Sequence, residues 1–162
     1  MTSPAYAGFV SPTPDDELVV IPALLRSARW AYGDAIRADL AESGYEDLPR
    51  NGSFVLGGMA NRGGSASDMI RGLGVTKQAA SQLIDTLVVR GYLTRDTDPD
   101  DRRRLVIDLT ERGRAAAAVV RSAIERVDSE LGAMLSPQEL SGLRAGLIAL
   151  SEIKESHEQK QP

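Results

Sequence analysis

The segment V-T-K-Q-A-A-S-Q-L-I-D-T-L-V-V-R-G, which runs from Val75 to Gly91, decides the fold of this chain. Its apolar residues recur in steps of three and four, the spacing of one buried face of an α-helix. These residues are Ala80, Leu83, Ile84, Leu87 and Val88. Thr76 can cap the first turn with its hydroxyl, and Gly91 can end the helix. The segment therefore predicts a short helix with two distinct faces.

The opposite face of this helix is polar and rich in amides, and it carries Lys77, Gln78, Ser81, Gln82 and Asp85. Gln and Lys are residue types that read base edges and phosphates in DNA. The preceding stretch, S-A-S-D-M-I-R-G-L-G, predicts a shorter helix with a capping box of Ser65 and Asp68, followed by a turn at Gly74. The two helices match the helix-turn-helix pattern, although helical hairpins without a DNA function share it.

The residues after the second helix predict a β-hairpin. An extended run begins at Tyr92 and resumes from Arg104 to Thr110, with apolar residues at alternate positions. Between them lies a charged turn that contains Asp98, Asp100, Asp101, Arg102, Arg103 and Arg104. Such a turn is either solvated and self-neutralising, or it uses its carboxylates to orient an arginine for a narrow minor groove.

The combined pattern resembles the MarR family of winged helix-turn-helix transcriptional regulators. The resemblance rests on L-G-V-T-K-Q-A-A-S-Q-L-I-D-T-L-V-V-R-G-Y-L-T-R, D-P-D-D-R-R and L-T-E-R-G, in that order, and covers Ser65 to Gly113. One departure is Ile70, which stands where such patterns often have Ala and affects the angle between the two helices.

The resemblance also implies roles for individual residues. The recognition helix would face the major groove and nearby phosphates with Thr76, Lys77, Gln78, Ser81 and Gln82. Arg103 would enter the minor groove from the wing, oriented by Asp101. Arg102 and Arg95 would contact the DNA backbone.

Composition limits the class of protein. A chain of 162 residues with 42% hydrophobic residues can bury roughly 70% of its unfolded surface in one domain. Cysteine is absent, which excludes disulfides, thiolate zinc sites and cysteine-based peroxide sensing. A net charge of −4 argues against a general nucleic-acid coat, but Lys77, Arg95 and the wing arginines concentrate positive charge on the proposed contact surface. With no signal peptide or long apolar stretch, we expect a cytoplasmic protein without membrane contact.

Periodic segments flank the winged region on both sides. Residues 1–16 contain three prolines and no periodicity, which predicts a flexible N-terminal arm. Apolar seams then predict a helix from Leu18 to Leu40, which Gly44 ends, and another from Thr110 to Met134. The last helix begins with a cap at Ser136, a proline at Pro137 and the capping-box acid Glu139. Another helix or helical turn is expected from Asp47 to Ala60.

The predicted fold is mainly α-helical with a small β-hairpin wing. Residues 47–110 form a winged helix-turn-helix domain, and residues 17–46 and 111–157 form a helical dimerisation region. A homodimer would bury the terminal seams, whereas the alternative is an intramolecular helical bundle.

Other chemistry finds little support. Asp96, Asp98 and Asp100 begin like a calcium loop, but Asp101 replaces the turn glycine and Ile107 replaces the bidentate glutamate. His157 is the only histidine and lies in a polar tail. We therefore expect neither a cofactor nor an enzyme.

Proteins of the family that this sequence resembles bind small, often aromatic or phenolic effectors between the dimer helices and the winged domain. Residues that could line such a cavity are Arg29, Trp30, Tyr32, Phe54 and Met59, but residues of these types more often belong simply to a core or an interface. We therefore assign no effector-binding residue from the sequence. The expected function is an effector-responsive repressor that binds a pseudo-palindromic DNA duplex as a homodimer. The alternative is a winged-helix protein-interaction module without DNA binding.

Overall fold

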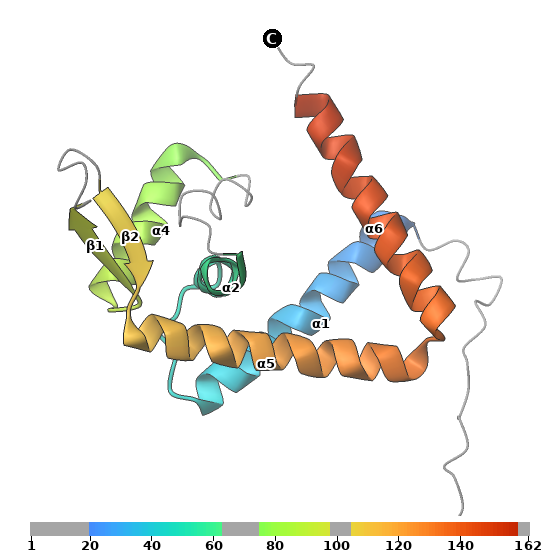
Figure 1. The fold of residues 1–162 in the computed structure, drawn as a ribbon, viewed down its shortest axis with the longest axis horizontal. Coiled ribbons are helices and arrows are strands. Elements are labelled where there is room, and N and C mark those ends of the chain that lie inside the picture. The colour runs from blue at the N-terminus through green and yellow to red at the C-terminus, as the bar shows by residue number, and fades with distance from the viewer. Residues whose placement is uncertain (1–19, 63–74, 98–104, 159–162) are drawn as a thin grey trace, which may run out of the picture. The chain divides into compact units, whose positions relative to one another are not determined.

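The computed structural model describes residues 20–62, 75–97 and 105–158 (Figure 1). Its elements are α1 (Ile21–Glu42), α2 (Gly52–Arg62), α4 (Lys77–Val89), β1 (Leu93–Thr97), β2 (Leu105–Leu109), α5 (Glu111–Met134) and α6 (Pro137–Glu158). The prediction of a mainly helical fold with one small hairpin is confirmed. The N-terminal arm, the helix expected after Ser65 and the tip of the wing lie outside the described residues. Within those ranges, no helix is long and apolar enough to cross a membrane.

The chain divides into two compact units. The winged unit spans Arg26–Glu125, and the terminal-helix unit comprises Met1–Leu25 and Arg126–Pro162. The boundaries fall inside α1 and α5, so each of these two helices has residues in both units. The fold of each unit follows from which apolar side chains it can enclose.

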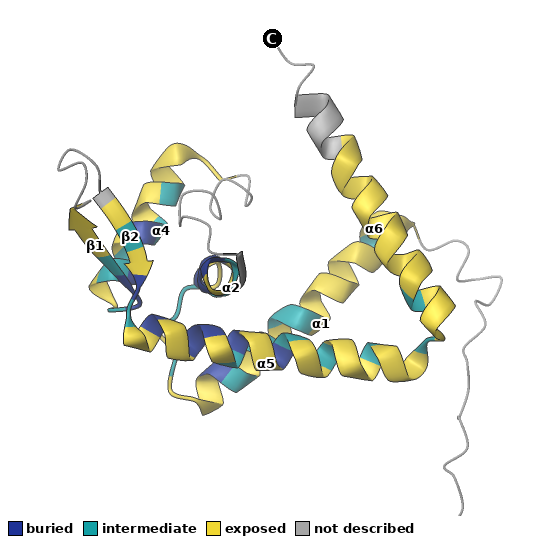
Figure 2. Ribbon diagram, viewed as in Figure 1, coloured by how far each residue is buried: buried dark blue, intermediate teal, exposed yellow. Residues whose placement is uncertain are grey.

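The winged unit contains a closed apolar core. Side chains from the end of α1, from α2, α4, the hairpin and the first half of α5 supply it, as the dark blue segments of Figure 2 show. Its largest fully enclosed side chains are Tyr92, Leu56, Leu87, Leu93 and Val55. Every apolar side chain that is buried in the described part of the chain belongs to this unit. Burial of this surface is the main force that holds the helices and hairpin together.

Helix ends in this unit follow local signals. The predicted stops at Gly44 and Gly91 are confirmed, since both glycines have positive φ angles, of 79° and 72°. The helix expected from Asp47 begins later, at Gly52. Pro49 explains why the helix does not begin at Asp47, because a proline disfavours helical backbone at the residue before it. Asp47 therefore lies in the connection between α1 and α2.

The two strands form an antiparallel hairpin. Leu93 pairs with Leu109 and Arg95 pairs with Ile107. Leu93 and Leu109 are buried at the base of the hairpin, whereas Val106 is exposed nearer to its tip. The core thus holds the base of the wing and leaves its outer part in solvent.

The terminal-helix unit has well-formed helix ends but exposed apolar faces. At the start of α6 the expected capping box is confirmed: Ser136 N donates to Glu139 Oε2 at 2.8 Å, and Glu139 N donates to Ser136 Oγ at 3.3 Å. Along this helix Leu143, Leu147 and Leu150 keep about two fifths of their surface exposed. Almost all of the described α6 is coloured as exposed in Figure 2.

Candidate nucleic-acid interface

Helix α4 presents a polar row on the surface of the winged unit. The Thr76 hydroxyl accepts a hydrogen bond from Ala79 N at 3.2 Å, which confirms the predicted N-cap. Ile84 and Leu87 are buried on the inner side of the helix. The five predicted contact residues, Thr76, Lys77, Gln78, Ser81 and Gln82, are all exposed. They gather in the N-terminal half of α4, where unpaired backbone amides and the helix dipole favour an anion such as a phosphate.

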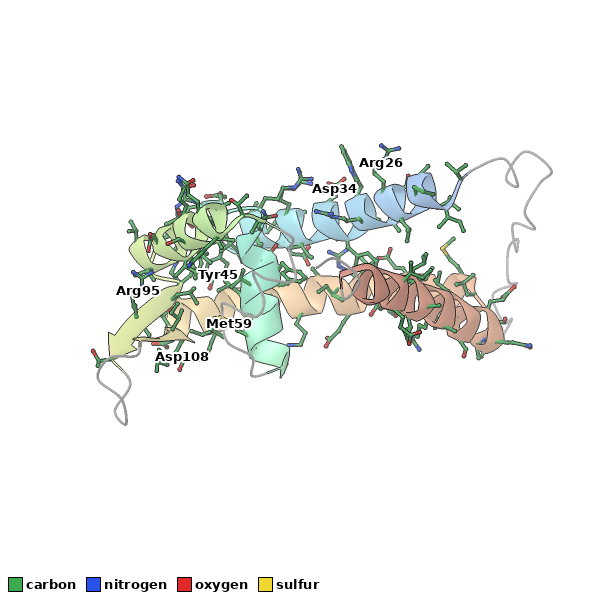
Figure 3. All side chains as sticks on the ribbon, turned by 90° about the horizontal axis from the view of Figure 1, so that it is seen from above. Arg26, Asp34, Tyr45, Met59, Arg95 and Asp108 are labelled. Atoms are coloured by element: carbon green, nitrogen blue, oxygen red, sulfur yellow. The ribbon has the colours of Figure 1, made fainter. Side chains whose placement is uncertain are left out.

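An ion pair joins this helix to the wing. Arg95 on β1 donates from Nη2 to Asp85 Oδ1 on α4 at 2.7 Å, and both side chains are partly exposed. Arg95, labelled in Figure 3, is the wing residue with a predicted DNA-backbone role that lies within the described residues. Asp101, Arg102 and Arg103 lie outside the described residues, so their roles stay predictions.

The start of α5 packs directly against the exit of α4. Thr110 Oγ1 donates to Gly91 O at 2.6 Å and accepts from Gly113 N at 2.9 Å, so this residue caps α5 and binds the preceding turn. Gly113 approaches the backbone of Tyr92 so closely that an added Cβ would lie 2.0 Å from the carbonyl oxygen. Through the L-T-E-R-G motif, α5 therefore contacts the turn that follows α4.

A second contact at the same place was not predicted from the sequence. The hydroxyl of the buried Tyr92 donates to Asp47 Oδ1 at 2.6 Å. That hydrogen bond, with help from the Arg112 and Arg90 charges, holds the pKa of Asp47 below its usual value. Burial, and then the bond to Asp47, raises the pKa of Tyr92 to about 12. Because 45 positions separate the two residues, no local pattern marks the pair.

The winged region and the fold both match known transcriptional regulators. Residues 46–104 match the model of the MarR family. Over 88 residues the chain is 33% identical to a putative transcriptional regulatory protein for the hcr operon of Thauera aromatica, in an alignment that covers 54% of this chain. The chain spans about half the length (52%) of that curated relative. The winged region is therefore similar to the MarR family.

Solved structures of regulatory proteins have the same fold as this chain. The S. aureus MepR–DNA complex matches with a TM-score of 0.67 at 21% identity, covering 83% of this chain and 98% of that one. Bordetella bronchiseptica BpsR, described with a mechanism for regulation of DNA binding by 6-hydroxynicotinic acid, matches with a TM-score of 0.61 at 23% identity. The match covers 82% of this chain and 93% of BpsR. These matches show that the chain shares the fold of the two solved proteins.

The remaining candidate residues divide between surface and core. Trp30 and Phe54 are exposed by 58% and 50%, whereas Met59 is buried and belongs to the core. The side chain of His157 lies outside the described part. Among the side chains that the structure describes, no three His, Asp or Glu residues are grouped to hold a metal ion.

Proposed function

We propose that this chain is a sequence-specific transcriptional regulator that binds double-stranded DNA through α4 and the wing. The carrying observation is the exposed polar row at the N-terminal half of α4, next to a hairpin. Lys77 supplies charge for a phosphate, and the amides of Gln78 and Gln82 can bond to adenine edges in the major groove. The similarity in fold to a regulator solved on DNA supports this proposal.

We also propose that the functional form is a homodimer. The terminal-helix unit exposes most of the large apolar side chains that are solvent-accessible in the described chain: Val20, Ile21, Leu24, Leu25, Met134, Leu143, Leu147, Ile148, Leu150 and Ile153. Exposure of this many large apolar side chains in one unit is typical of a protein interface. A twofold dimer would present two α4 helices to half-sites one helical turn apart, roughly 34 to 36 Å.

A small aromatic or phenolic effector would regulate this dimer as a repressor in the cytoplasm. The ligand would bind more tightly to a dimer whose two α4 helices are wrongly spaced for DNA than to the DNA-binding dimer. The ratio of these two ligand affinities sets how far the DNA affinity falls. BpsR, whose DNA binding is described as regulated by 6-hydroxynicotinic acid, supports this mode of control. We assign no cofactor and no catalytic activity to the chain.

The first test is selection of bound duplexes from a random DNA pool, followed by fluorescence anisotropy over a salt series. The proposal expects an enriched inverted repeat and a steep fall in affinity with salt. No enrichment at low salt, from a folded dimer, would instead favour a protein-interaction module without DNA binding.

Lys77→Ala tests the contact from the recognition helix. If Lys77 neutralises one phosphate, the slope of log affinity against log salt falls by about one unit. Arg121→Ala, which removes an exposed cation from α5, is the matched control and should keep the wild-type slope. An unchanged slope in the Lys77 variant rejects that contact.

Arg103→Ala tests the wing. Loss of a minor-groove arginine should weaken binding to the selected duplex by about 1 to 3 kcal/mol while the dimer stays intact. Analytical ultracentrifugation reports the dimer, and anisotropy reports the affinity. Wild-type affinity in this variant removes the wing tip from the binding mechanism.

A further inference from the structure

Four charged or aromatic side chains meet where α4 ends, β1 begins and α5 begins. Asp47 Oδ1 accepts from the Tyr92 hydroxyl at 2.6 Å and from Arg112 Nη2 at 2.9 Å. Arg90, the C-cap residue of α4, donates to the backbone carbonyl of Asp47. One short connection between α1 and α2 thus holds residues of three other segments.

Arg112 closes this cluster from the first turn of α5. Its Nη1 donates to Arg90 O at 2.6 Å, and its guanidinium lies over the Tyr92 ring at 4.4 Å from the centroid. Tyr45, labelled in Figure 3, lies with its ring centroid 6.3 Å from that of Tyr92. The guanidinium therefore forms hydrogen bonds and stacks on the Tyr92 ring at the same time, which restricts its orientation.

The bonds of this cluster restrict orientation more than they add stability. Apolar burial is non-directional, and a phenylalanine at position 92 would fill the same volume. The ion pair of Arg112 and Asp47 is about two fifths exposed, and exposed pairs contribute little free energy. Hydrogen bonds, by contrast, require particular distances and angles between the segments that they join.

A small change of angle at the C-terminal end of α4 produces a large displacement of its N-terminal end. The helix has 13 residues, which corresponds to about 20 Å at a rise of 1.5 Å per residue. A rotation of about 10° around its C-terminal end would move Lys77 and Gln78 by roughly 3 Å, close to the 3.4 Å spacing along one DNA strand. A small change at the cluster thus equals a shift of about one base pair.

We propose that Asp47, Tyr92 and Arg112 form a joint that sets the angle between α4 and α5, and thereby the half-site spacing that the dimer accepts. These are positioning residues, because they act on DNA through α4 and do not contact it. The inference rests on the proposed function, in which two copies read two half-sites. It predicts that loosening the joint relaxes spacing selectivity.

The DNA experiment compares the selected duplex with duplexes one base pair longer and shorter between the half-sites. The wild type should discriminate by at least tenfold, and Tyr92→Phe and Asp47→Asn should each reduce this ratio at least threefold. Asp34→Asn removes an acidic partner from the exposed ion pair with Arg37 and serves as the charge-matched control. Its ratio should equal that of the wild type. Full discrimination in folded Tyr92→Phe overturns the joint even if Asp47→Asn does not fold.

A second arm needs no DNA. The chain has no cysteine, so spin labels can be placed at the exposed positions of Ala79→Cys on α4 and Arg121→Cys on α5. Labelled chains are diluted with unlabelled ones, so that only distances within one chain are measured. Tyr92→Phe should broaden the distance distribution, and an unchanged distribution overturns the joint. If the wild type binds no duplex, the proposed function fails while this arm still decides the joint.

Discussion

The winged unit encloses an apolar core, whereas the terminal-helix unit leaves many large apolar side chains exposed. In the winged unit, Leu56, Leu87 and Tyr92 are fully enclosed by other elements of the same chain. In the terminal-helix unit, Ile148 and Met134 remain 60% and 71% exposed. Both regions carry regular apolar periodicity, so periodicity alone does not tell whether a face is covered within the chain or by a partner. The apolar core of the winged unit is closed within one chain, whereas the terminal-helix unit has exposed apolar surface that is available to a partner.

The largest expected effect comes from placing charge on the exposed seam of the terminal-helix unit. Leu143→Glu combined with Leu147→Glu removes four leucines from the proposed twofold interface, at about 1.5 kcal/mol each. The dimer should weaken by about 6 kcal/mol, more than ten-thousandfold. Sedimentation velocity measures this, with Gln138→Glu on the same helix as control. A variant that remains dimeric at micromolar concentration would place the interface elsewhere.

A smaller but still severe effect is expected from Gly113→Ala in the winged unit. The added methyl group would lie 2.0 Å from Tyr92 O, so α5 or the base of the hairpin must shift. We expect the free energy of unfolding to fall by about 4 kcal/mol. Gly33→Ala in α1 has open space around its Cβ and should be neutral or stabilising. Urea denaturation measures both variants, and equal stability of the two would contradict the close contact.

The third effect appears only at high pH. The pKa of Tyr92 is raised from 10.0 to about 12 in the folded protein. The contribution of this shift to the free energy of unfolding is therefore fully present below pH 10. It is then lost as the pH rises from 10 to 12, because the unfolded state releases its proton first. The loss should reach about 3 kcal/mol at 1.36 kcal/mol per pKa unit. Between pH 9 and 12, the denaturation midpoint should fall less steeply for Tyr92→Phe than for the wild type. Parallel pH profiles would exclude the ionisation of Tyr92 as the cause of the fall.

Sequence reasoning succeeded where the signals were local. Thr76 and Gly91 mark the two ends of α4 as expected, and the capping box of Ser136 and Glu139 forms at the start of α6. It misplaced the start of α2, which begins at Gly52 instead of Asp47, because Pro49 outweighs the apolar pattern. It did not foresee the pairing of Arg95 with Asp85, because side-chain partners across elements depend on packing angles.

The sequence by itself determined the type and order of the described elements and which face of α4 is polar, because caps, stops and periodicity act over a few residues. Only the tertiary structure decided which groups meet at the base of that helix. Asp47, Tyr92 and Arg112 are separated by 45 and 20 positions, and they come together because core packing brings a connection, a strand and a helix to one point. The distances and angles of that meeting are a property of the fold and appear in no local pattern.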